Sequence, residues 1–446
     1  MPTSLLGRAM VALLQSDIGG SVSGDVDPVS CRGRILRATP VKRSIAIIFA
    51  VPLVFAALDN VQAQTSTVVK KHSLQIDVHA RPAIGQFVPA DDEVQHLVYE
   101  LFMVNWQKED LRLASFDVED AATGKLLAQY DTKALEDPNR IGTVPFNSEL
   151  KGPPNRLLLA GRTAVITIHV RLPLGASVPA AVQHRIKFES DPNLRLILDD
   201  GSESSELFAV SEPMPIDRRP PVVMGPPLRG GPWFCANALF DPFSPHDAQI
   251  PYARTARIHV VSRFGCDFAK IAKVNGEITA WRPQTPVDIN LSAFYSYGAD
   301  VMAVADGLVI QTKDGIPENI PRTERKTIMP VPLTEATVNG NMIALQIGKG
   351  QYAFYVHLQP GSIRVKEGDR VRKGQLLARL GNSGNTDGPH LHFHVGRGPR
   401  ISEDDFLPYG FTSYWLDGRG GDFPAKRKLF EFKMPTRNSI ITFPDR

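Results

Sequence analysis

The chain has 446 residues, and its 50 lysines and arginines exceed its 47 aspartates and glutamates by a formal net charge of +3. A balance this close to neutral excludes, on bulk charge alone, a protein built to bind nucleic acid. With 43% hydrophobic and 22% charged residues, the composition is that of a globular protein of about two to three domains, and 36 prolines and 35 glycines favour short strands joined by turns over a helical bundle.

Residues 1–63 have the features of a secretory signal region. Lys42 and Arg43 precede an apolar run over residues 45–58, and the Val-Gln-Ala sequence that follows at residues 61–63 suits a signal peptidase. The run is shorter than the ~20 residues that cross a bilayer as a helix. We therefore expect cleavage after Ala63 and a mature chain without a stable membrane span, located in the periplasm, at the cell envelope or outside the cell.

Residues 64–210 are expected to form an immunoglobulin-like β-sandwich. Apolar and polar residues alternate over 164–172 with a period of two, which places one set of side chains on each face of a strand. Several short strands separated by turn residues over about 150 residues are typical of a sandwich. The further strands are expected over residues 97–104, 111–118, 185–188 and 194–198.

A proline-rich linker over residues 211–232 separates this domain from a second one. It contains seven prolines, a composition that favours an extended polyproline conformation and argues against pairing into a sheet. The second domain is expected over residues 233–446. Within it, residues 311–341 are predicted to form a long loop between two strands, which is either a rim of the binding groove or a surface insertion.

Export would leave two cysteines in the mature chain, Cys235 and Cys266. An exported protein permits one disulfide between them. A small buried thiol is the alternative, and the spacing of the pair does not decide between the two.

Three histidines of the second domain, His390, His392 and His394, alternate with apolar residues. On a strand, residues i, i+2 and i+4 point to the same side, so the three imidazoles would line one face. Two imidazoles at this spacing can share a cation, or one can bind the cation while the other moves a proton. A histidine pair on a strand is more often structural, so other motifs must support a metal site.

Six motifs follow one another in the second domain, at residues 298–301, 303–307, 355–358, 365–371, 373–375 and 388–393. In this order, over residues 263–396, they resemble the lysostaphin-type zinc endopeptidases, whose domain is called LytM. The resemblance implies an antiparallel β-sheet with a groove and cleavage of peptide bonds in bacterial peptidoglycan. Carried over position by position, it makes Asp267 and His392 zinc ligands and makes His357 and His390 the catalytic acid/base pair.

One position departs from the family pattern. Arg263 stands four residues before Asp267, where the family has its first zinc-binding histidine. A guanidinium stays protonated and offers only donors, so Arg263 cannot bind zinc and could pair with the Asp267 carboxylate instead. Two histidines could replace the missing ligand: His394, on the same strand face as His392, and His246, in a proline-rich segment.

Three functions compete on these observations. The first is an exported zinc metalloendopeptidase that cleaves peptidoglycan, which His357, His390 and His392 favour. The second is a catalytically inactive domain of the same fold that binds cell wall or regulates another hydrolase, which Arg263 favours. The third is a lipoyl or biotinyl carrier, suggested by the turn within residues 365–380, but the lysine on a hairpin tip that a carrier needs is missing.

Overall fold

The computed structural model describes residues 70–72, 74–80, 85–136, 141–144, 156–190, 194–198, 200–239, 246, 249–252, 257–260, 263–282, 290–323, 326–401 and 405–445. The signal region predicted for residues 1–63 lies outside them. The described residues include one short helix, α2 (Thr132–Leu135), and the 3-10 turns η2 (Leu291–Ala293) and η3 (Gly420–Asp422), and His246 also has 3-10 conformation. None of the helices in this part of the chain is long and apolar enough to cross a membrane. The predicted all-β fold class is confirmed.

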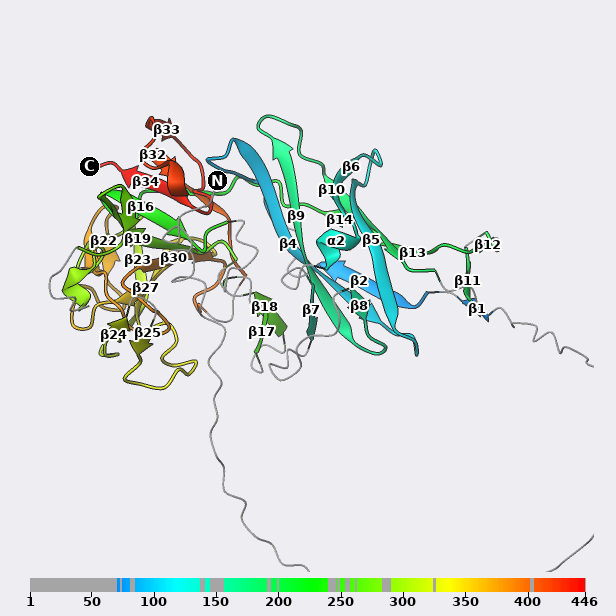
Figure 1. The fold of residues 1–446 in the computed structure, drawn as a ribbon, viewed down its shortest axis with the longest axis horizontal. Helices are drawn as coiled ribbons and strands as arrows, with labels where there is room; N and C mark the ends of the chain where they lie inside the picture. The colour runs from blue at the N-terminus through cyan, green and yellow to red at the C-terminus, as the bar shows by residue number, and fades with distance from the viewer. Residues whose placement is uncertain are drawn as a thin grey trace, which may run out of the picture.

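Two antiparallel sheets make up the sandwich in the N-terminal half (Figure 1). One sheet has the order β13 (Leu207–Val210), β10 (Ala181–Phe188), β5 (Leu111–Asp120) and β6 (Leu126–Tyr130), with β14 (Met214–Pro215) paired to β10 and β8 (Leu157–Leu158) paired to β5. The other has the order β2 (Ile76–Ala80), β4 (Val94–Asn105), β9 (Thr163–Pro173) and β7 (Ile141–Val144), with β3 (Val88–Pro89) paired to β4.

The sandwich core follows from the period of two in its strands. On β9, Ile166, Ile168 and Val170 are fully buried, whereas Thr167 is half-buried and Arg171 is exposed. The buried residues join those of β4, β5 and β10 in one apolar cluster between the two sheets. Burial of alternate side chains from both sheets is what holds a β-sandwich together.

A ten-stranded antiparallel sheet organises the C-terminal half. Its order is β28 (Arg370–Val371), β23 (Gly307–Lys313), β26 (Asn341–Gly348), β27 (Gln351–Leu358), β30 (Leu391–Gly396), β19 (Cys266–Lys270), β16 (Gly230–Ala236), β34 (Ser439–Phe443), β32 (Tyr414–Arg419) and β33 (Lys428–Phe430). Strands that are far apart in sequence, β19 and β30, are therefore direct neighbours at the centre of the sheet.

Six small sheets complete the described structure. They are β1 (Lys70–His72) with β11 (Leu194–Ile197) and β12 (Glu203–Ser204); β15 (Val222–Met224) with β31 (Tyr409–Phe411); β17 (Gln249–Tyr252) with β18 (Arg257–Val260); β20 (Ala272–Val274) with β21 (Glu277–Thr279); β22 (Asp300–Met302) with β29 (Leu376–Arg379); and β24 (Ile320–Thr323) with β25 (Lys326–Ile328). The hairpin β24–β25 lies inside the segment predicted to be a long loop.

The proline-rich segment 211–232 takes part in sheets, contrary to the prediction. Strand β14 pairs with β10, β15 pairs in parallel with β31, and β16 already begins at Gly230. The physical reason is that Val222–Met224 lies between the prolines and contains residues that favour strands. Proline itself is tolerated at strand ends and sheet edges, where its missing N–H is not needed.

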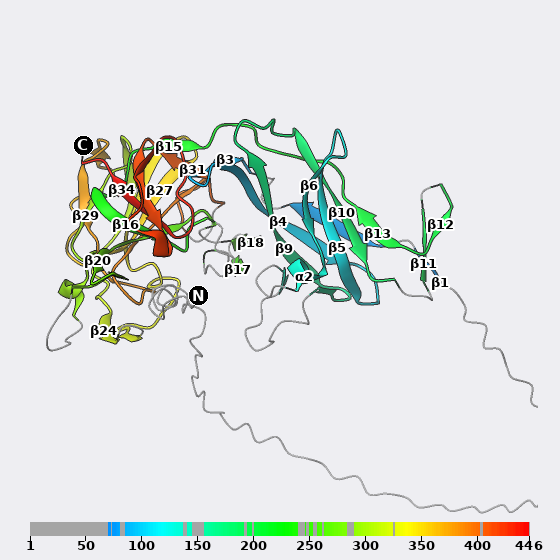
Figure 2. The ribbon, with the colours of Figure 1, turned by 45° about the horizontal axis from the view of Figure 1, so that its top comes forward.

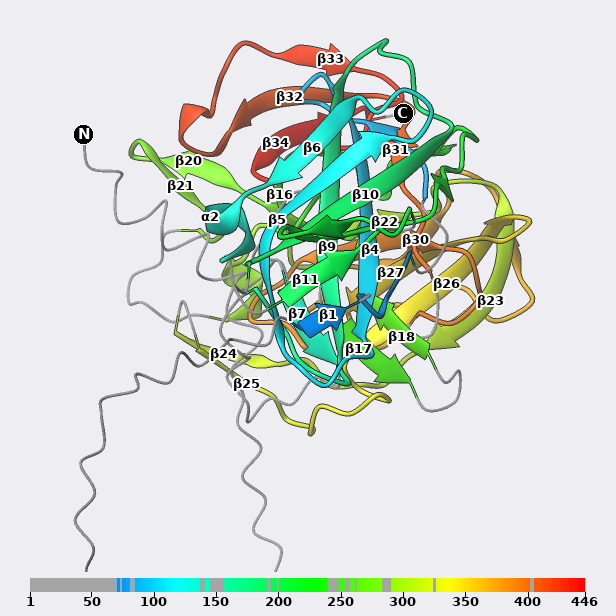
Figure 3. The same ribbon diagram turned by 90° about the vertical axis from the view of Figure 1, so that its right-hand side faces the viewer.

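The two halves of the chain are joined by buried contacts near β3 and β4. Val88, Ala90 and Val98 belong to the same apolar cluster as the core of the ten-stranded sheet. Asp91 is buried and accepts hydrogen bonds from Thr436 Oγ1 at 2.8 Å and from Arg419 Nη2 at 2.8 Å. Figure 2 shows β3 beside β31, and Figure 3 shows the sandwich strands in front of the ten-stranded sheet. The sandwich thus packs directly on the C-terminal half.

Candidate metal centre and imidazole pair

Strand pairing brings Asp267 and His392 together at the centre of the ten-stranded sheet. The two residues are direct partners in the antiparallel register of β19 and β30. His392 Nδ1 lies 2.8 Å from Asp267 Oδ1. Side chains directly opposite each other on neighbouring strands point to the same face, so the pairing alone places a carboxylate beside an imidazole.

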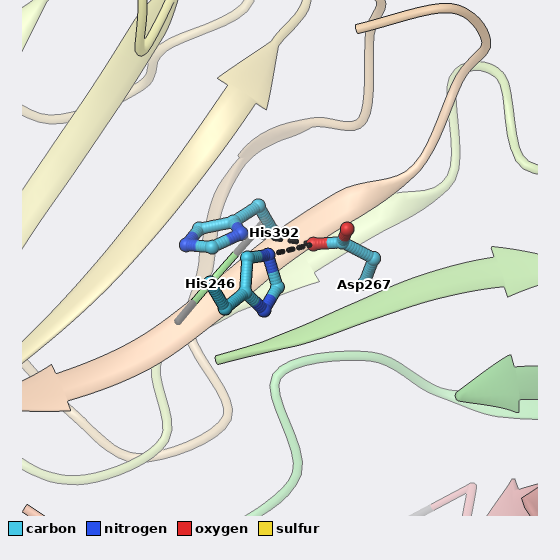
Figure 4. A group of neighbouring side chains, drawn as sticks. All are labelled: His246, Asp267 and His392. Atoms are coloured by element: carbon cyan, nitrogen blue, oxygen red, sulfur yellow. Dashed lines mark hydrogen bonds and ion pairs between the residues drawn. The ribbon is translucent and has the colours of Figure 1, made fainter. Parts of the chain in front are cut away.

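His246 reaches the same carboxylate from outside the sheet (Figure 4). Its Nε2 lies 3.4 Å from Asp267 Oδ1, and its ring packs edge-on against the ring of His392 with centroids 4.6 Å apart. One donor atom from each of the three buried side chains lies within 4.8 Å of the others. Donors bound to one tetrahedral zinc at ~2.0–2.1 Å lie about 3.3 Å from each other, so only small shifts would be needed.

The chemistry of this group suits a divalent metal such as zinc. Two imidazole nitrogens and one carboxylate oxygen are a three-ligand set that leaves a fourth position open. Asn237 Nδ2 donates to Asp267 Oδ2 at 2.8 Å, which leaves Oδ1 directed at the two histidines. Outer hydrogen bonds of this kind orient the ligands of metal sites. Asn237 has no motif around it, and the sequence analysis did not identify it.

The electrostatics of the group also favour metal binding. Burial alone would raise the pKa of the Asp267 carboxyl. The surrounding imidazoles outweigh this effect through their charges and hydrogen bonds, and they hold that pKa well below its ordinary value. Burial lowers the pKa of His392 to about 4. At neutral pH the carboxylate is therefore ionised and the His392 imidazole is neutral, which are the forms that bind a metal.

His357 and His390 form an imidazole pair beside this group. Their ring centroids are 4.8 Å apart, and His390 Nε2 lies 3.6 Å from Asp267 Oδ1. His357, the penultimate residue of β27, has a positive φ of 65°, a strained conformation for a residue with a side chain and one that occurs often at active sites. Burial, followed by the charges of the neighbouring histidines, lowers the pKa of His357 well below its ordinary value.

Arg263 does not bind Asp267, and that prediction was wrong. Its Nε donates to Glu100 Oε1 of β4 at 2.9 Å, and its Nη2 contacts Glu100 Oε2. Both side chains are buried, and although burial lowers the pKa of Arg263 to about 10, the guanidinium remains charged at neutral pH. Because the sandwich supplies the counter-ion, the Asp267 carboxylate is left to the histidines.

His394 lies outside the group formed by His246, Asp267 and His392, so the geometry favours His246 of the two possible replacement ligands. His394 Nδ1 lies 2.8 Å from His392 Nε2, on the side of the His392 ring that faces away from Asp267. Its ring is enclosed by Phe354 and Phe406, with centroids 5.0 and 4.8 Å away. The alternation along β30 places His394 on the same face as His392, but the His392 ring lies between His394 and Asp267, so His394 is not in the group of three candidate ligands.

Comparison with known proteins agrees with this geometry. Residues 286–402 match the model of peptidase family M23. This segment is therefore similar to the M23 peptidase domain. His357, His390 and His392 lie inside the matched segment, whereas His246 and Asp267 precede it. The predicted resemblance to lysostaphin-type peptidases is confirmed.

Named relatives of the M23 domain include peptidoglycan hydrolases. The chain is 39% identical over 56 residues to the peptidoglycan DD-endopeptidase ShyA of Vibrio cholerae, covering 13% of each chain. It is 31% identical over 150 residues to an uncharacterized metalloprotease of Haemophilus influenzae, covering 33% of this chain and 25% of that one. The matches thus span a quarter or less of these relatives. The solved catalytic domain of lysostaphin from Staphylococcus simulans is 22% identical, with a TM-score of 0.18, over 29% of this chain and 85% of that chain.

Close to Asp267, Cys235 and Cys266 are buried free thiols on the neighbouring strands β16 and β19. The permitted disulfide is therefore not formed in this structure. The thiols contribute to the apolar core of the ten-stranded sheet, which is the alternative that the sequence left open.

Proposed function

We propose that the protein is a zinc-dependent endopeptidase that cleaves peptide bonds in peptidoglycan and acts outside the cytoplasm. The observation that carries the proposal is the group formed by His246, Asp267 and His392, with the imidazole pair of His357 and His390 beside it. A group of three ligands next to two proton-transfer groups is the arrangement that metal-assisted hydrolysis needs.

Each residue has a distinct role in this proposal. His246, Asp267 and His392 hold the zinc ion, which when bound supplies Lewis-acid activation of water and of the peptide carbonyl. His390 and His357 would exchange a proton with the attacking water at one ring and donate a hydrogen bond or proton to the substrate at the other. Asn237 orients the Asp267 carboxylate.

The proposed substrate is supported by the comparisons with known proteins, whereas the proposed location is supported by the N-terminal sequence. Membership in family M23 and the name of the Vibrio cholerae relative, a peptidoglycan DD-endopeptidase, support a peptidoglycan peptide as the substrate. The apolar run and cleavage sequence before residue 64 support export to the compartment where peptidoglycan lies. The inactive-binder alternative depended on Arg263 blocking Asp267, and the Arg263 contact with Glu100 removes that support.

The test combines metal content with digestion of purified peptidoglycan. The wild-type chain should carry about one zinc per molecule and release soluble muropeptides. His246→Ala and His392→Ala should lose zinc and activity, whereas His357→Ala should keep zinc and lose activity. His79→Ala, a histidine substitution in the sandwich, is the control. A wild-type chain that binds peptidoglycan without cutting it, with or without zinc, would refute the proposal.

A further inference from the structure

The loop over residues 382–388 fixes the orientation of both imidazoles of the pair. The carbonyl of Ser383 accepts a hydrogen bond from His357 Nδ1 at 2.8 Å. The carbonyl of Gly388 accepts one from His390 Nδ1 at 2.9 Å, and Thr386 Oγ1 lies 3.2 Å from the same nitrogen. A carbonyl oxygen can only accept, so both histidines carry their proton on Nδ1.

This choice of tautomer decides what the imidazoles can do. With the proton on Nδ1, a neutral ring has its lone pair on Nε2. His390 Nε2 is the atom that faces the metal group, 3.6 Å from Asp267 Oδ1. The 382–388 loop therefore supplies two carbonyls that orient both rings and that direct the basic Nε2 of His390 toward the metal group, and a displaced loop would release both rings together.

The loop is held in place by Asn319, which comes from the segment inserted between β23 and β26. Asn319 Nδ2 donates to the carbonyl of Gly384 at 2.7 Å and to that of Thr386 at 2.8 Å. The backbone of Asn319 donates to the Asn382 carbonyl at 2.8 Å, and Asn382 Nδ2 donates back to the Asn319 carbonyl at 3.2 Å. Asn319 is only 1% exposed, so these bonds are shielded from water.

The other end of the inserted segment packs against the same loop. Asn385 N donates to the carbonyl of Val338 at 2.8 Å. Gly340 lies so close that a Cβ there would be 2.2 Å from the Ser383 carbonyl oxygen, and a Cβ on Gly384 would be 2.3 Å from Gly340 N. Both glycines also have positive φ, which favours glycine. The loop is thus clamped between the two ends of the insertion.

We propose that Asn319 is a positioning residue: through the 382–388 loop it holds His357 and His390 in the tautomer and orientation that hydrolysis requires. The insertion is then part of the catalytic apparatus, in addition to any contact it makes with substrate. The catalytic consequence rests on the proposed function, whereas the effect on the two histidine tautomers does not.

The experiment compares Asn319→Ala and the nearly isosteric Asn319→Asp with Glu335→Gln, which changes an exposed side chain of the same insertion. In full-length protein labelled with 15N-histidine, the wild type should show His357 and His390 protonated on Nδ1, assigned with His357→Gln and His390→Gln. Both Asn319 variants should show mixed tautomers. Their kcat should fall about 10- to 100-fold, the range for small misplacements of catalytic groups, with KM and zinc content unchanged.

The possible results separate the two proposals. If Asn319→Ala and Asn319→Asp keep the wild-type tautomers and the kcat of Glu335→Gln, the clamp is refuted. If the wild type cleaves no peptidoglycan, but His357 and His390 lose their Nδ1 protonation in the Asn319 variants, the positioning role of Asn319 is supported and the proposed substrate is wrong. Asn319→Ala removes the amide donor without adding a charge. If both variants show the same change in tautomers and kcat, the change comes from loss of the donor and not from charge repulsion.

Discussion

Removing Arg263 should destabilise the protein strongly, because Glu100 would be left as a buried, unpaired carboxylate. The Glu100 side chain is 1% exposed and that of Arg263 is 5% exposed. Breaking one side of a buried ion pair costs about 3–5 kcal/mol. Arg263→Met keeps most of the apolar stem and removes the charge, so it tests the pair rather than the packing.

The loss of unfolding free energy has an upper bound, because the unpaired Glu100 carboxylate can take up a proton and become neutral. For an ordinary glutamate pKa of about 4.3, protonation costs about 3.7 kcal/mol at pH 7 and about 1.0 kcal/mol at pH 5, at 1.36 kcal/mol per unit. The loss of unfolding free energy in Arg263→Met should therefore be about 2.7 kcal/mol smaller at pH 5 than at pH 7.

The assay is denaturant unfolding at both pH values, for Arg263→Met, Glu100→Met and the double variant. Replacing both partners by apolar residues should recover most of the loss, since a buried ion pair and a well-packed apolar pair are of similar stability. Zinc content should not change in Arg263→Met, nor rise in Arg263→His, because His246 already faces Asp267. A loss below about 0.5 kcal/mol at pH 7, or additive effects in the double variant, would refute the reasoning.

Three further predictions concern the metal group and the sandwich. His246→Ala should weaken zinc binding by at least about 100-fold, measured by chelator competition, because it removes one of three ligands. Asn237→Ala should weaken it about 10- to 100-fold by releasing the Asp267 carboxylate. Burial lowers the pKa of His184 to about 3. The contribution of the neutral His184 to the unfolding free energy is therefore full above pH 6.5 and is lost as the pH falls toward 3. The total loss of unfolding free energy is up to about 4–5 kcal/mol. His184→Gln should flatten that part of the stability profile.

The controls for these predictions come from the same chain. His79→Ala should leave zinc affinity unchanged, and Thr334→Ala, at an exposed position, should leave the pH profile of stability unchanged. Equal zinc affinity in wild type and His246→Ala would remove His246 from the site. A stability profile with the same slope between pH 3 and 6.5 in His184→Gln would show that other groups account for acid destabilisation.

Local pattern was enough to predict individual strands and part of the candidate site. The alternation over 164–172 predicted β9, and the alternation over 390–394 placed His390, His392 and His394 on one face, because side-chain direction on a strand is a local property. The motif order showed the resemblance to M23 peptidases, which in turn made His357 and Asp267 candidate site residues. These inferences need no knowledge of how distant segments pack.

The parts that could not be predicted depend on contacts distant in sequence. Glu100 lies 163 residues from Arg263, so nothing near Arg263 indicates where its counter-ion is. His246 was one of two candidates, and only its contacts with Asp267 and His392 distinguish it from His394. Asn319 and Asn237 act through single hydrogen-bonding groups that have no sequence signature. Tertiary contacts decided all four.

The buried contacts of Asp91 also constrain how the chain acquires its structure. Asp91 meets Thr436 across 345 residues of sequence, and Val88, Ala90 and Val98 complete an apolar core whose other members come from the C-terminal half. During synthesis the sandwich strands emerge first and expose that apolar edge until the last strands follow. Long-range pairing of this kind slows folding and prolongs exposure of aggregation-prone surface. Removing the final strands, β32 to β34, should therefore impair solubility of the whole chain, although they contribute no residue to the metal group.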